Sequence, residues 1–153
     1  MSPVNESESE VQLAGWWRRV GATFADDLIL LIPSLIIADL FRSFAGGFVS
    51  IIAGLAMEGF YMVALLSSAS GQTIGNRVAA TRVRDSLTGS VITRQQAIKR
   101  WGFIALYGLL VPVGGPIMYV ALLVAIVDIV YPLMNPRKQT LHDLYARTIV
   151  VKI

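Results

Sequence analysis

Long apolar segments separated by short polar connections constrain this chain more than any other feature. Residues 20–41 and 44–66 are mostly apolar, and a third apolar stretch covers residues 101–134. With 55% hydrophobic residues and a mean hydropathy of +0.64, the 153-residue chain has more apolar surface than one water-soluble core needs. Because a helix of about 20 apolar residues crosses a bilayer, the sequence predicts an integral membrane protein whose partner is the lipid bilayer.

The number of crossings depends on the third apolar stretch. It is too long for one span and contains Pro-Val-Gly-Gly-Pro at residues 112–116, a strong turn signal. The predicted fold is therefore an all-α membrane protein with four transmembrane helices. One long kinked helix in place of the last two would give three. The predicted spans cover residues 20–41, 44–66, 95–111 and 117–134.

Charge predicts the orientation of these spans. Lys and Arg outnumber acidic residues between residues 71 and 100 and again after residue 134. Since basic residues mark cytoplasmic segments, we expect a multi-pass protein of the inner (cytoplasmic) membrane, with loop 71–94 and both termini in the cytoplasm. Residues 1–12 are polar and acidic, which predicts a disordered tail before a transmembrane domain at residues 13–153.

The polar loop also carries β-strand signals. Residues 80–84 alternate in polarity before a glycine turn, and residues 90–93 follow, so this segment predicts a short hairpin. Residues 148–153 are a second strand candidate. Because an isolated two-stranded ribbon is only marginally stable, we expect both segments to join in one small cytoplasmic β element.

Acidic residues inside the predicted spans are the main functional signal. Asp26, Glu58 and Asp128 lie about 9–12 Å from the cytoplasmic ends of three spans, at a rise of 1.5 Å per residue. A charged carboxylate at such depth costs roughly 2.5–3.5 kcal/mol, so each must be protonated, paired or bound to a cation. With Asp27 they form a candidate proton or cation pathway. The alternative is structural pairing, because Arg19 and Asp26 are seven residues apart on one helical face.

Other kinds of chemistry find little support in the sequence. There is no cysteine and only one histidine, so we expect no metal site, no cofactor and no thiol nucleophile. His142 and Asp143 lack a serine in a nucleophile-elbow context, and we interpret them as the cap of the last helix, not as part of an enzyme. The basic residues form no continuous patch, which argues against nucleic-acid binding.

Three sequence blocks together resemble the RDD family of small bacterial membrane proteins, named for one Arg and two Asp. The first is Trp17-Arg18-Arg19 followed by Asp26, the second is Gly71-Gln-Thr-Ile-Gly75-Asn-Arg77, and the third runs from Asn135 to Asp143. The resemblance places the family motif at Arg19, Asp26 and Asp143, with Asp27 as an extra acid. Asn135 and Asn76 depart from the Asp and Lys that are usual in the family. Cation/proton antiport has been proposed for some members.

Three functional hypotheses follow. The first is a small transporter, possible as a homo-oligomer, that exchanges protons for Na⁺ or K⁺ with Asp26 and Glu58 as protonatable ligands. The second is a non-transporting scaffold or accessory protein in which Arg19, Asp26 and Asp143 form a structural clasp. The third is a sensor of anionic lipid head groups that uses the basic segment 77–100.

Overall fold

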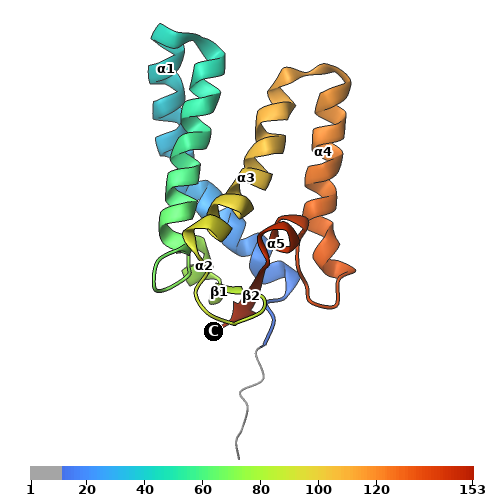
Figure 1. Ribbon diagram of the computed structural model, residues 1–153. Coiled ribbons are helices and arrows are strands. Elements are labelled where there is room, and N and C mark those ends of the chain that lie inside the picture. The colour runs from blue at the N-terminus through green and yellow to red at the C-terminus, as the bar shows by residue number, and fades with distance from the viewer. Residues whose placement is uncertain (1–11) are drawn as a thin grey trace, which may run out of the picture.

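The computed structural model describes residues 12–153 and consists of two helical hairpins standing on a small sheet and two short helices (Figure 1). The acidic segment predicted to be disordered lies outside the described residues apart from Gln12. The Gln12 carbonyl accepts a hydrogen bond from the Lys152 amide at 2.8 Å, so the chain is tied to the sheet immediately before the first helix.

The first hairpin is formed by α1 (Trp16–Leu66), which consists of two helices joined at Gly46. Gly46 has φ +82°, a conformation that is strained for residues with a Cβ, and the chain reverses there (Figure 1). The Ser50 hydroxyl donates to the Ala38 carbonyl at 3.0 Å and ties the two arms together. The predicted helical hairpin over residues 20–66 is confirmed.

The second hairpin is formed by α3 (Arg94–Leu110) and α4 (Gly115–Val130), which run side by side in opposite directions (Figure 1). Between them lie the 3₁₀ turn Val111–Val113 and two glycines with positive φ, Gly114 and Gly115. The predicted break at residues 112–116 is therefore confirmed, and a single long kinked helix in this region is wrong. A second 3₁₀ turn, Tyr131–Leu133, follows α4.

Among residues 12–153, three helices are long and apolar enough to cross a membrane: Trp16–Ser43, Ala45–Leu66 and Gly115–Leu133. Their outer faces expose large apolar side chains, such as Ile32, Phe60 and Leu123, that a soluble protein would bury. Helix α3 has only 17 residues and begins with a basic turn, so a fourth crossing stays a prediction.

The sheet pairs β1 (Thr81–Asp85) with β2 (Thr148–Lys152) in antiparallel register, with Val83 opposite Val150. The predicted β element built from both segments is confirmed, but the predicted hairpin is wrong because residues 90–93 are not a strand. Thr93 instead caps α3 through a capping box with Gln96. The segment therefore leads into the start of α3 instead of forming a strand.

A small apolar core joins the sheet to the helices. It contains Val63 and Leu66 from the end of α1, Val83 and Val150 from the sheet, and Ala97 from α3. The short helices α2 (Ile74–Val78) and α5 (Leu141–Ala146) lie at the same end of the molecule (Figure 1). The core therefore holds the sheet, and the loops that carry α2 and α5, close to the polar residues at this end of the spans.

Candidate functional site

Asp143 is the most heavily bonded carboxylate at the junction of the helices and the sheet. It is fully buried in the first turn of α5, where it forms a capping box with Thr140. Its Oδ2 lies 2.6 Å from Arg19 Nη1, its Oδ1 contacts the Arg100 guanidinium, and the Thr148 hydroxyl donates to Oδ1 at 2.9 Å. One side chain thus connects α1, α3, α5 and β2, and the predicted capping role at this position is confirmed for Asp143.

Asp26 does not pair with Arg19, so the predicted ion pair between them is wrong. Its carboxylate accepts hydrogen bonds from the Tyr61 hydroxyl at 2.5 Å, the Thr73 hydroxyl at 2.6 Å and the Gly75 amide at 2.7 Å. Asp26 therefore binds the start of α2 to both arms of α1. Arg19 forms its ion pair with Asp143 instead, because the loop carrying α5 folds back against the first helix.

Glycine at position 75 permits this contact. A Cβ atom built there would overlap the Ala22 carbonyl oxygen and the Asp26 carboxylate. The backbone amide of Gly75 reaches Asp26 only because no side chain separates α2 from α1. The second sequence block of the resemblance, residues 71–77, therefore serves to dock a loop onto an acid inside the first span.

Asp128 is 1% exposed and is bound by the residue before Asp143. The His142 amide donates to its Oδ1 at 3.0 Å, and His142 Nδ1 lies 2.6 Å from its Oδ2. Burial and the positive charge of Arg100 lower the pKa of His142 to about 4, although Asp128 opposes the shift. At neutral pH the imidazole is uncharged, and its Nδ1–H donates to the carboxylate.

A cavity of about 450 Å³ lies between the two helical hairpins and brings the predicted acids together. Asp26, Asp27, Glu58 and Asp128 all line it, as do Arg19, Arg100 and His142. Its remaining walls are mainly apolar and aromatic, including Trp16, Phe24 and Tyr107. The sequence singled out four acids on three predicted spans, and in the fold all four line one cavity.

These four acids fall into two classes. The carboxylates of Asp26 and Asp128 accept several hydrogen bonds from protein donors, whereas the side chains of Asp27 and Glu58 form no hydrogen bond or ion pair with any residue from 12 to 153. Both unpaired carboxyl groups come from α1, one from each arm. Within the described residues, no group of three or more acidic, histidine or cysteine side chains is arranged to hold a metal ion. The free pair suits a proton or a small monovalent cation.

Several residues of this site were not predicted from the sequence. Tyr61, Thr73 and Thr148 supply hydroxyl donors, and Arg100 is buried beside Asp143. The Thr-x-x-Asp spacing of residues 140–143 was a usable helix-start signal for Asp143. Nothing local in the sequence marks Arg100 or Tyr61, whose partners are distant along the chain.

The sequence profile of the RDD family matches residues 13–147. The chain belongs to the RDD family. The match begins at residue 13, where the transmembrane domain was predicted to start, and ends just before β2. No curated protein and no solved structure shows a significant match to the chain.

The RDD motif residues occupy two separate bonding networks in this structure. Arg19 and Asp143 belong to one ion-paired cluster, whereas Asp26 belongs to the hydrogen-bonded contact between α1 and α2. Arg19 and Asp26 also line the cavity between the hairpins. The residues to which the resemblance assigned the family motif therefore join segments around this cavity, while the unpaired acids, Asp27 and Glu58, lie beside them.

Proposed function

We propose that this RDD family protein is a small transporter that exchanges protons for a monovalent cation such as Na⁺ or K⁺. The observation that carries the proposal is the pair Asp27 and Glu58, which lines a cavity between apolar helices without a protein donor among the described residues. A carboxylate at this depth that has no protein partner requires a proton or a cation, and exchange of one for the other is the elementary step of antiport.

We propose that, within the predicted group of acids, Asp27 and Glu58 are the groups that take up the proton or cation. Asp26 was expected to bind the ion, but its three hydrogen bonds give it a structural role at the start of α2. Asp128 is similarly held by His142. In the proposed mechanism Asp27 and Glu58 bind the proton or cation, while Asp26 and Asp128 keep the cavity open between the two hairpins. No covalent chemistry is involved, and the protein is not proposed to be an enzyme.

We further propose that the sheet end of the molecule faces the cytoplasm of a bacterial cell and that the spans cross its inner membrane. Charge supports this orientation. Arg77, Arg84, Lys138 and Lys152 belong to the sheet end, whereas the connection between α3 and α4 carries no charge. A homo-oligomer is part of the proposal because a single copy exposes most of its helical surface.

Proton flux in liposomes tests the transport proposal. Purified protein is reconstituted with an internal pH dye, and Na⁺, K⁺ or Li⁺ is added outside. We expect cation-dependent proton movement that disappears in Asp27→Asn and in Glu58→Gln. Asp39→Asn is the matched control, because Asp39 lies in the same helix but does not line the cavity. Absence of flux with all three cations, from folded protein, would overturn the proposal.

A second candidate function rests on the ion-paired cluster. In this reading the protein is a non-transporting scaffold or accessory protein, and Arg19 and Asp143 clasp the first helix to α5. Asp26 is not part of that clasp. This reading predicts that Arg19→Gln and Asp143→Asn lower the abundance of the protein, while variants of Asp27 and Glu58 have no functional consequence. The flux measurement therefore distinguishes the two candidates.

A further inference from the structure

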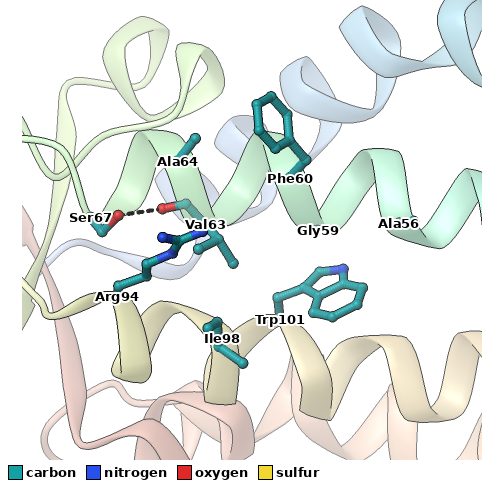
Figure 2. A pocket seen from close by; sticks show the side chains of 9 residues that line it. All are labelled: Ala56, Gly59, Phe60, Val63, Ala64, Ser67, Arg94, Ile98 and Trp101. Atoms are coloured by element: carbon teal, nitrogen blue, oxygen red, sulfur yellow. Dashed lines mark hydrogen bonds between the residues drawn. The ribbon is translucent and has the colours of Figure 1, made fainter.

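We propose that a groove between α1 and α3 binds one anionic phospholipid from the surrounding bilayer. The groove has a volume of about 530 Å³ and is separate from the acidic cavity, with which it shares no lining residue (Figure 2). It lies between the second arm of α1 and the first turns of α3. The inference does not depend on the transport proposal.

Most of the groove is apolar and is built from small residues facing one large ring. Gly59 and Ala56 line the α1 side, and Trp101 lies against them from α3 (Figure 2). A Cβ atom at Gly59 would overlap the Trp101 ring, so the missing side chain sets how closely the helices approach. Phe60 and Ile98 are 78% and 48% exposed, so the walls of the groove face outward from the protein. Such a surface matches a hydrocarbon chain.

One end of the groove is cationic. Arg94 is the first residue of α3, and its side chain extends toward Val63 and Ser67 of α1 (Figure 2). Ser67 immediately follows the span Ala45–Leu66, so the guanidinium lies where the apolar helices give way to the polar domain. Within residues 12–153, the Arg94 side chain forms no hydrogen bond or ion pair. Its charge is therefore available to a ligand.

This pattern defines the occupant by charge complementarity. A ligand that fits must carry an anion at the membrane boundary and hydrocarbon below it, which is the structure of an acidic phospholipid. The planar guanidinium binds phosphate oxygens through paired hydrogen bonds, and basic pockets between membrane helices are known binding sites for anionic head groups. The sequence suggested that the whole basic segment 77–100 senses lipid head groups. The present proposal assigns head-group binding to one cation, Arg94, and acyl-chain binding to the adjoining groove.

Quenching of Trp101 fluorescence tests the site directly. The chain has three tryptophans, so Trp16→Phe with Trp17→Phe leaves Trp101 as the reporter. The protein is reconstituted in phosphatidylcholine vesicles that contain a minor fraction of one brominated lipid. In one sample this lipid is brominated phosphatidylglycerol, and in the other it is brominated phosphatidylcholine. We expect the brominated anionic lipid to be enriched about fivefold at Trp101, the effect of one cation near the surface. Arg94→Gln should abolish this preference, and Arg94→Lys should retain most of it.

Lys99→Gln is the matched control, because Lys99 is an exposed cation on the same helix that does not line the groove. Native mass spectrometry gives an independent readout that does not depend on the tryptophan substitutions. It compares the chain with all its tryptophans and the Arg94→Gln variant of that chain, each in an equal mixture of the two lipids. Equal quenching by both brominated lipids would overturn the proposal. So would a preference that survives Arg94→Gln, or the absence of quenching by either lipid, which would indicate that protein covers the groove.

Discussion

Arg19 Nη1 lies 2.6 Å from Asp143 Oδ2, and this ion pair joins residues separated by 124 positions in the chain. Both side chains are largely buried, with 10% and 0% exposure. Arg100 contacts the other carboxylate oxygen, so a single acid balances two buried cations. The pair fixes the first turn of α1 against α5, and Arg19 also lines the cavity between the hairpins.

Loss of the Asp143 charge should destabilise the protein strongly. Asp143→Asn leaves the guanidinium groups of Arg19 and Arg100 buried without a carboxylate, and breaking a buried pair costs about 3–5 kcal/mol. Thermal or denaturant unfolding in a fixed detergent measures the change. Asp39→Asn, at an exposed site in α1, should leave the unfolding midpoint unchanged. Equal midpoints for the two variants would mean that the cluster contributes no stability.

Truncation of the neighbouring acids Asp26 and Asp27 should change the free energy of unfolding by different amounts. Asp26→Ala leaves the donors of Tyr61, Thr73 and Gly75 without their acceptor, and an unsatisfied buried donor costs about 1–3 kcal/mol. Asp27→Ala removes a carboxyl group that binds no described residue. We therefore expect a lower free energy of unfolding for Asp26→Ala and little change for Asp27→Ala. A loss of stability at position 27 as large as at position 26 would contradict the division of these acids into structural and ion-binding groups.

Addition of one methyl group at residue 75 should disturb the contact between α2 and α1. The new Cβ of Gly75→Ala would overlap the Ala22 carbonyl and the Asp26 carboxylate, and overpacking of this kind costs about 1–3 kcal/mol. Gly102→Ala is the control, because a Cβ there meets no atom within 4 Å. Unfolding in detergent should show a loss for the first variant only. A stable Gly75→Ala protein would show that the loop can move away from α1 without cost.

The stability of the protein should fall in mild acid because of His142. Burial and Arg100 lower its pKa from 6.5 to about 4 in the folded protein, so the unfolded chain binds more protons between these values. Stability is therefore greatest above pH 6.5 and is lost as the pH falls toward 4, by about 3 kcal/mol in total.

His142 is the single histidine of the chain, so its ring resonances can be followed by NMR without overlap from other imidazoles. The ring should remain neutral at pH 5.5, where an ordinary histidine is mostly charged. In His142→Gln, the loss of stability between pH 6.5 and 4 should be much smaller. An ordinary titration midpoint near 6.5 would show that the ring is accessible to water and not buried against Asp128.

Sequence patterns identified the elements of this fold whose causes are local. The apolar stretches predicted both helical hairpins, and the Pro and Gly residues at 112–116 predicted the break between α3 and α4. Alternation predicted β1, and residues 148–153 were a second strand candidate that forms β2. The hairpin within residues 80–93 failed for an equally physical reason. Residues 90–93 have the composition of a strand, but Thr93 and Gln96 form the capping box of α3. Whether this segment becomes a strand or a helix start depends on its tertiary contacts.

The sequence alone predicted the depth of the acids in the bilayer, because depth follows from position along a membrane-spanning helix. Their partners were decided only by the tertiary structure. Arg19 and Asp26 share a helical face, yet Asp26 is bound by α2 and Arg19 by α5, since two loops fold back onto the same helix. Helical periodicity describes which residues of one helix are neighbours. It contains no information about which distant segment will bring a hydroxyl, an amide or a carboxylate within hydrogen-bonding distance, and that choice determined which acids remain free.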